Sequence, residues 1–240
     1  MSELYRDFID RKLSSIDGHL VDIINDIQPG PGPGPGDDKP IFTKTVLADN
    51  SSLSGTFTLS DNVSNYDLIE FITLDNTDNY YNRFIMTAGC INDILNLNTT
   101  NKLICFNTLG TNRYVAYTVT GNVYTRYNYR VLNVVQVNGY KCTNKTVTED
   151  VLFSTTTKSD SYINIPTTED IYDYDMILIG YNDTDDDEIG PINNIFYPND
   201  TLGKNVYLTN NFYNVSYNTF IESNMFYNIR PVYIRGIKYE

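Results

Sequence analysis

The chain has 240 residues, which is enough for two domains of about a hundred residues each together with an extension. Hydrophobic residues account for 41% and charged residues for 20%, so a chain that is disordered throughout is excluded. The net charge of -13 repels polyanions, and nucleic acid is therefore not expected as a partner.

Residues 1–28 carry the only sustained helical periodicity. Their apolar residues recur alternately four and three positions apart, which is the heptad pattern of a coiled coil. The β-branched d positions favour a homotrimer, with a dimer as the alternative. We predict a helical segment for anchoring or oligomerisation. Its apolar residues include Phe8, Ile9, Leu13, Ile16, Leu20, Ile23 and Ile27.

The apolar face of this segment is wider than a coiled-coil seam requires, because Leu4, Phe8, Val21 and Ile24 lie beside the seam. Two interpretations stay open: the segment oligomerises and docks on another protein, or it packs on the β-rich part of its own chain. No apolar run of 18 residues and no cleavage-type leader occurs, so neither membrane insertion nor signal-peptide secretion is expected.

Residues 29–40 are predicted to be a linker. Pro and Gly alternate over residues 29–36, so every second residue lacks an amide hydrogen and neither helix nor sheet continues. The period of two excludes a collagen triple helix, which needs Gly at every third position. The alternating stretch spans roughly 25 Å. It is typical of a stalk, and a plain domain linker explains it equally well.

From Ile41 onward, short alternating runs separated by Asn, Asp, Gly and Ser indicate strands. The 21 Tyr and 11 Phe fit this interpretation, since aromatic residues favour strands. We predict an all-β architecture of two tandem antiparallel β-sandwich modules, jelly-roll-like. Each module should hold about seven or eight strands and no helix.

The two modules are predicted at residues 41–142 and 143–240, because the same landmarks recur in the same order. Their separation is 105 to 108 residues at first and 97 at the end, which indicates a net deletion in the second copy. The matched pairs are Val46-Leu47 with Val151-Leu152, the strand at 65–71 with 173–179, Asn76-Thr77-Asp78 with Asn182-Asp183-Thr184, and residues 137–141 with 234–238.

Catalytic equipment is sparse in the β-rich part of the chain. His19 is the only histidine and lies in the N-terminal segment, so a Ser-His-Asp or Cys-His site within one β module is not available. No metal or nucleotide motif occurs, so no cofactor, no metal and no enzymatic activity are expected. Cys90, Cys105 and Cys142 form no C-x-x-C pair and are expected as free, mostly buried thiols. A carboxylate pair that cleaves glycosides remains the one enzymatic alternative.

Two features could bind a ligand. The acidic run 183–188 offers oxygens to calcium but lacks the EF-hand order, and a solvated hairpin loop is the simpler interpretation. Tyrosines on the predicted strands could stack on sugars, although strand propensity alone also explains them. These tyrosines are Tyr124, Tyr127, Tyr129, Tyr213, Tyr217 and Tyr227.

The order of helix, Pro-Gly spacer and twin β modules resembles fibre proteins of tailed bacteriophages. Each module closes on a V-N-G-Y-K or I-R-G-I-K strand after a strand of N-Y-D-L-I-E-F type. The resemblance covers residues 41–240 and is greatest to head and tail fibres of phages of gut Bacteroidota, including the crAss-like group.

The resemblance implies a virion component whose N-terminus docks on a capsid or tail protein and whose β modules face outward. The modest length and the wide apolar face favour a capsid-attached head fibre. A tail fibre that recognises host-surface carbohydrate is the alternative. The sequence identifies neither the receptor nor the attachment partner.

Overall fold

The computed structural model describes residues 39–97, 102–108, 113–155, 164–166, 168, 170–183, 188–191, 205–208, 211–216, 219–224 and 229–240. The predicted N-terminal segment 1–28 and all but the last two residues of the linker 29–40 lie outside this range. The predicted helix, its seam residues and the trimer therefore stay predictions.

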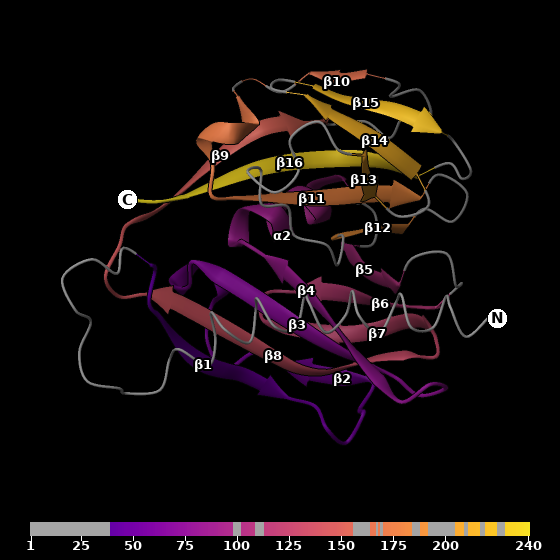
Figure 1. Cartoon of the computed structure of the whole chain (residues 1–240). Coiled ribbons are helices and arrows are strands. Elements are labelled where there is room, and N and C mark those ends of the chain that lie inside the picture. The colour runs from indigo at the N-terminus through magenta and orange to yellow at the C-terminus, as the bar shows by residue number, and fades with distance from the viewer. Residues whose placement is uncertain are drawn as a thin grey trace.

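The first half of the described chain contains eight strands, one α-helix and a short 3-10 helix (Figure 1). They are β1 (Phe42–Asp49), β2 (Thr56–Thr58), η1 (Val63–Asn65), β3 (Leu68–Asp75), β4 (Tyr80–Met86), α2 (Ala88–Leu97), β5 (Leu103–Thr108), β6 (Arg113–Thr120), β7 (Val123–Arg130) and β8 (Leu132–Cys142).

The second half contains eight further strands and a second short 3-10 helix among its described residues. They are β9 (Val147–Ser154), β10 (Asn164–Pro166), η2 (Ile171–Asp173), β11 (Met176–Asp183), β12 (Glu188–Pro191), β13 (Asn205–Leu208), β14 (Asn211–Ser216), β15 (Thr219–Asn224) and β16 (Ile229–Tyr239).

The strands form four antiparallel sheets, two in each half. Sheet A has the order β1-β8-β3-β4 and sheet B the order β2-β7-β6-β5. In the second half, sheet C has the order β9-β16-β11-β12 and sheet D the order β10-β15-β14-β13. Each strand of the first half thus has a counterpart in the second, in the same place in its sheet. The predicted all-β, antiparallel architecture is confirmed at this level.

Aromatic side chains join sheets A and B across the core of the first half. The ring of Phe71 on β3 lies 4.8 Å from that of Phe106 on β5 and 5.7 Å from that of Tyr124 on β7, centroid to centroid. Phe57 on β2 stacks on Tyr124 at 5.1 Å. These rings are buried, because alternate residues of each strand point to one face of its sheet. The core of the first half therefore lies between its two sheets.

The irregularities of the sheets are repeated as well as the strand order. Each half has three β-bulges, and strand pairing alone does not require a bulge at any of these places. The repetition therefore points to duplication of one ancestral unit, while the exact boundaries of the two units stay a prediction. The breaks in register fall at Val46/Ala48 and Phe153/Val151, at Ile72/Thr73 and Gly180/Tyr181, and at Ala116/Tyr117 and Phe212/Tyr213.

A tyrosine ring lies over a glycine at the same corner of each half. Tyr66 covers Gly139, and Tyr174 covers Gly236. A Cβ at either glycine would come closer than 3.0 Å to carbons of the ring, so only glycine fits there without a shift. This packing explains why a tyrosine before β3 and a glycine within β8 recur as sequence landmarks.

An aspartate follows each of these tyrosines and fixes the end of the sheet. The Oδ2 atom of Asp67 accepts a hydrogen bond from the backbone N–H of Cys142 at 2.7 Å. The corresponding atom of Asp175 accepts one from Tyr239 at 2.8 Å. The recurring Tyr-Asp pair therefore has a structural role in both halves, which accounts for its reappearance.

Two sequence predictions about the modules are wrong. No helix was expected within them, yet α2 lies in the first half and buries Cys90, Ile91 and Ile94. Its apolar residues are three and four positions apart, as in an amphipathic helix. The hydroxyl of Thr87 caps its N-terminus by accepting a hydrogen bond from the N–H of Cys90 at 3.1 Å. Only ten residues long, it was hidden among strand-like runs.

The expected match of 76–78 with 182–184 is also wrong. Asp75 pairs with Tyr80 in the β3–β4 hairpin, and Asp183 pairs with Glu188 in the β11–β12 hairpin. The hairpins therefore align at a separation of 108 residues, which makes Asp183 the counterpart of Asp75. Turns rich in Asn, Asp and Thr look alike when shifted by two residues, and only the strand register distinguishes the alignments.

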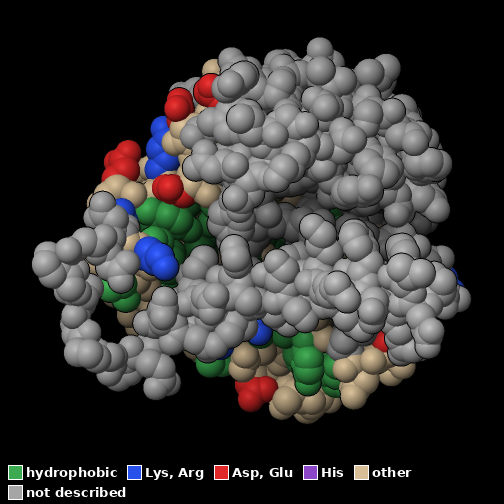
Figure 2. Space-filling view, in the orientation of Figure 1, with side chains coloured by type: hydrophobic (Ala, Val, Ile, Leu, Met, Phe, Trp, Pro, Cys, Tyr) green, Lys and Arg blue, Asp and Glu red, His purple; other side chains and the backbone are tan. Residues whose placement is uncertain are grey.

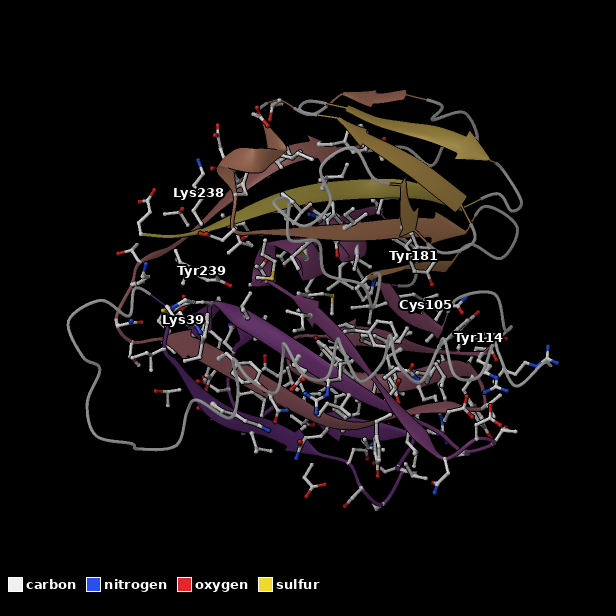
Figure 3. All side chains as sticks on the ribbon, in the orientation of Figure 1. Lys39, Cys105, Tyr114, Tyr181, Lys238 and Tyr239 are labelled. Carbon is white, nitrogen blue, oxygen red and sulfur yellow. The ribbon has the colours of Figure 1, made fainter. Side chains whose placement is uncertain are left out.

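The two halves are not independent bodies separated by solvent. Helix α2 contacts β11, β12 and β16, and β5 contacts β12 (Figure 1). Met176, Leu178 and Ile237 of sheet C belong to the same buried cluster as the core of the first half. Figure 3 shows Cys105 and Tyr181 at this junction. A continuous apolar core therefore joins the halves.

Candidate functional site at the end of β7

The tyrosines proposed for sugar stacking differ in their surroundings. Tyr124 is buried in the core at 1% exposure, so its prediction as a stacking residue is wrong. Tyr127 is 61% exposed and Tyr129 is 52% exposed. Tyr213 lies on β14, where only the backbone is described, while Tyr217 and Tyr227 lie outside the described residues. The end of β7 is thus where the structure presents candidate tyrosines to solvent.

Five consecutive residues form what we call the β7 patch: Arg126, Tyr127, Asn128, Tyr129 and Arg130. The guanidinium carbon of Arg126 lies 4.4 Å from the centroid of the Tyr129 ring. The Nη1 atom of Arg126 also donates to Oδ1 of Asn133 at 2.6 Å. Asn128 donates through Nδ2 to the hydroxyl of Tyr114 at 3.1 Å. These contacts orient the patch, and both tyrosine side chains stay more than half exposed although Arg126 lies over the Tyr129 ring.

The geometry of the patch follows from a bulge and a short neighbouring strand. Tyr127 is the extra residue of the β6–β7 bulge, because Ala116 pairs with Asn128 and Tyr117 with Arg126. On the other side of β7, β2 pairs only with Val123–Thr125. The remaining residues of β7 therefore run past the end of β2, where Arg126 is half-buried and residues 127–130 are exposed.

The corner that follows the patch is strained. Val131, between β7 and β8, has a φ of 72°, a left-handed conformation that is costly for a β-branched residue. Its carbonyl accepts a hydrogen bond from the N–H of Asn76 at 3.1 Å, which ties the corner to the β3–β4 hairpin. The strain is therefore held in place by the hairpin next to the patch.

The arginines of the patch differ from the other described arginines in their ion pairing. Five arginine side chains are described, and Arg83, Arg113 and Arg235 each lie within 4.0 Å of a carboxylate. Arg126 and Arg130 form no ion pair with any described residue. Over the β9–β16 end, by contrast, acidic and basic side chains lie side by side (Figure 2). Among the described arginines, the two without carboxylate partners are both in the β7 patch.

Sequence reasoning did not single out these two arginines. A signal was present, since Arg and Tyr alternate in the run 126–130 of a chain with 30 acidic and 17 basic residues. Whether an arginine has a carboxylate neighbour depends on tertiary distances, however, and no spacing rule supplies them.

A second cluster lies at the junction of the halves. Arg235 on β16 donates through Nε and Nη2 to Oδ2 of Asp93 on α2 at 2.9 and 2.8 Å, and through Nη1 to Oε1 of Glu149 on β9 at 2.8 Å. Thr87 donates to the same Oε1 atom of Glu149. Each charged group in the cluster has an opposite partner, so its role is to fasten the halves together.

The thiol of Cys90, which lies beside this cluster, is expected to be unreactive. Burial raises its pKa from 9.0 to about 11, more than hydrogen bonds from Thr87 lower it. The thiol is therefore protonated at neutral pH and is a poor nucleophile. Cys105 and Cys142 are also free and buried, which confirms the expected state of the three cysteines.

The two buried carboxylates of β3 do not form a glycosidase pair with each other. Glu70 accepts from Asn138 and from the hydroxyl of Tyr140, both at 2.8 Å. Asp75 is bound by Arg113 at 2.6 Å. Being five residues apart on one strand, the two carboxylates face opposite sides of sheet A. They cannot flank one substrate.

The acidic run at 183–188 is described only at its two ends, where Asp183 pairs with Glu188 across the β11–β12 hairpin. Calcium binding and a solvated loop both stay predictions. In the part of the chain that the structure describes, no three His, Cys, Asp or Glu side chains gather in a way that could hold a metal ion. Nor does a described helix have the length and apolar character needed to cross a membrane.

Comparison of the chain with protein-family models, with curated proteins and with solved structures finds no match. The fold and the β7 patch therefore carry the functional proposal.

Proposed function

We propose that the chain is a non-enzymatic virion protein, a head fibre attached to the capsid, with two antiparallel β-sandwich, jelly-roll-like modules displayed outward. The supporting observation is the repetition of one bulged strand order in two halves that share a continuous core. Duplication extends a surface structure without a new fold, and the shared core keeps the second copy fixed to the first.

The N-terminal segment supplies attachment in this proposal. Residues 1–28 hold three copies together and dock on a capsid protein, and the Pro-Gly linker spaces the β modules from that anchor. Removal of residues 1–36 should then lower the mass of the assembly to that of a monomer in light scattering. An unchanged mass would assign association to the β modules instead.

The location on the particle is the direct test. Antibodies raised against residues 41–240 should bind to phage heads in immunogold electron microscopy, and cryo-EM density for the fibre should begin on the capsid. Label on the tail alone would reject the head fibre in favour of the tail fibre. Label on neither would reject a virion protein altogether.

The tail fibre that recognises host-surface carbohydrate is the second candidate, and the β7 patch favours it. Exposed tyrosines offer flat apolar faces with polar tips, which suit sugar rings. If this candidate is correct, the purified full chain should compete with phage particles for adsorption to host cells. Adsorption that stays constant at saturating protein would count against it.

A further inference from the structure

We propose that the β7 patch is a binding site for an acidic polysaccharide that wraps the free edge of β7, with Arg126 and Arg130 contacting sugar carboxylates on opposite faces of the strand and Tyr127 and Tyr129 contacting sugar rings. The proposal rests on display of the β modules at a surface, as proposed above, and it names the ligand class and the residues.

The charge of the patch is the first argument. A chain with 30 acidic residues offers many partners, and Arg83 has one while Arg113 and Arg235 have two each. Arg126 and Arg130 have none among the described residues. Even Asp78, in the hairpin next to the patch, is paired with Arg113. Guanidinium groups bind carboxylates with two parallel hydrogen bonds, so these two arginines are suited to a carboxylate from outside the chain.

The exposed rings are the second argument. Large aromatic side chains are normally buried, and each exposed ring leaves apolar area in water. Tyr127 and Tyr129 are both more than half exposed within three residues. The guanidinium of Arg126 holds the Tyr129 ring in place, so less side-chain freedom is lost when a ligand binds. Tyrosine next to arginine thus provides both kinds of contact that a charged sugar needs.

The second half of the chain supplies the third argument. The β14–β15 bulge corresponds to the β6–β7 bulge, and the register aligns Glu222 with Arg126 and Asn224 with Asn128. Ser223, the extra residue, takes the place of Tyr127. The same hairpin therefore forms with an acid and a serine in place of the arginine and the tyrosine. Since the bulged hairpin forms without either of them, a ligand is a reason for their presence in the first half.

An acidic polysaccharide fits better than the other polymers. A protein of net charge -13 repels every polyanion at long range, and it repels nucleic acid most strongly because nucleic acid has the higher charge density. A neutral polysaccharide would use the tyrosines and leave both arginines without a carboxylate partner. A chain of uronic acids has a lower charge density than DNA and offers a ring face and a carboxylate in each unit.

The test uses the full-length chain and polygalacturonate, with the methyl-esterified polymer and oligo(dT) as comparison probes, in biolayer interferometry. The full-length chain should bind polygalacturonate, bind the esterified polymer at least about tenfold more weakly, and release polygalacturonate as salt rises. No binding to polygalacturonate, equal binding to the esterified polymer, or preference for oligo(dT) would each overturn the proposal.

Variants assign the binding to the patch. R126Q/R130Q should weaken binding about tenfold or more, whereas K39Q/K44Q, with the same change in charge at exposed lysines of the β1 end, should not. Y127S introduces the residue of the second half at an exposed site and should weaken binding without a change in thermal unfolding. Equal losses in both double variants would indicate attraction by net charge and would overturn the site.

The test of the β7 binding site is independent of the test of whether the chain is a virion protein. Immunogold label on the virion without binding to polygalacturonate would leave surface display intact and reject the β7 site. Binding that depends on the patch, in a protein missing from the particle, would retain the site and reject the virion proposal.

Discussion

Sheets A and C correspond to each other, but the matching face of each sheet contacts different partners. In sheet A this face carries a polar network, in which Glu70 accepts from Asn138 and Tyr140. In sheet C the matching positions are largely apolar and pack on the first half. Cross-strand pairing aligns Glu70, Asn138 and Tyr140 of the first half with Leu178, Arg235 and Ile237 of the second.

This difference teaches that the duplicated backbone does not decide what its outer face contacts. Bulges, corner glycines and strand order are kept in both copies, while the residues on the outer face have diverged. A polar network needs partners for every buried donor and acceptor, whereas an apolar face needs a surface to cover it. Divergence of side chains on an unchanged frame is enough to join the copies, and the following predictions test that view.

The largest expected effect concerns the leucines in the repeated β1 and β9 bulges. Leu47 and Leu152 are almost completely buried, at 1% and 0% exposure. Replacing either with alanine should lower the free energy of unfolding by about 2–5 kcal/mol, because the core loses contacts and gains a cavity. Urea denaturation followed by circular dichroism would measure both losses.

The neighbouring valines are matched controls for the leucines. Val46 is 48% exposed and Val151 is 45% exposed, so Val46→Ala and Val151→Ala should each cost less than about 1 kcal/mol. A large loss at Leu47 with none at Leu152 would mean that the two bulges, although alike in register, do not support their halves equally.

The next effect concerns the bond between the halves. Arg235→Met would leave Asp93 and Glu149 without their cation in a largely buried place, since the arginine side chain is 11% exposed. We expect a loss of about 2–4 kcal/mol in the free energy of unfolding, somewhat below that for fully buried pairs because both acids are partly exposed. A second transition should appear in differential scanning calorimetry if the halves separate before they unfold.

Arg83 offers a comparison within the first half. It lies 3.4 Å from Glu70 and is 36% exposed, and Glu70 is buried but keeps its hydrogen bonds from Asn138 and Tyr140, so Arg83→Met should cost less than Arg235→Met. Equal losses for Arg83→Met and Arg235→Met would refute the view that the junction depends on its ion pairs more than the polar network of sheet A does.

How far the sequence predicted this structure depends on the range of each interaction. Alternation and turn residues act over a few positions, so the strands, the antiparallel class and the repeated Tyr-Asp and glycine landmarks could be found. Strict alternation would place Tyr124 on the opposite face of its strand from Tyr127 and Tyr129, but which of the two faces is buried depends on the sheet that packs against it, so the three tyrosines looked equivalent. The junction and the lack of a carboxylate partner at Arg126 depend on contacts between distant segments, which no local pattern records.

The third prediction concerns α2, the helix that the first half places against sheet C. Burial raises the pKa of Cys90 to about 11 from 9.0. Between these pH values the unfolded chain loses the thiol proton before the folded one does, so stability falls as pH rises. The contribution of Cys90 amounts to about 2–3 kcal/mol over this window. It is fully present below pH 9.

Comparison with Cys90→Ala isolates this contribution. Burial also raises the pKa of Tyr124 and Tyr233, so wild type and variant should both lose stability in alkali. The wild type should lose more between pH 9 and 11, and the two curves should run parallel below pH 9. Curves that stay parallel throughout would show that the thiol is not held in its neutral form by the fold.

The smallest effect sharpens the comparison at the corners of the two halves. Gly139→Ala and Gly236→Ala would each push a Cβ into a tyrosine ring, and we expect each to lower the free energy of unfolding by about 1–3 kcal/mol. Gly55→Ala is the control, since its nearest neighbour is Nη2 of Arg126 at 3.6 Å, an ordinary contact. That change should cost less than about 0.5 kcal/mol.

Double variants decide whether the tyrosine ring causes the loss of stability in the glycine variants. If the clash is with Tyr66, the cost of Gly139→Ala should shrink in a Tyr66→Leu background, and the cost of Gly236→Ala should shrink likewise in a Tyr174→Leu background. Additive losses would assign the effect to the strand backbone. Coupling at one corner and additivity at the other would mean that the tyrosine–glycine contact stabilises only one copy. The two corners would then have diverged in function, as the outer faces of sheets A and C have.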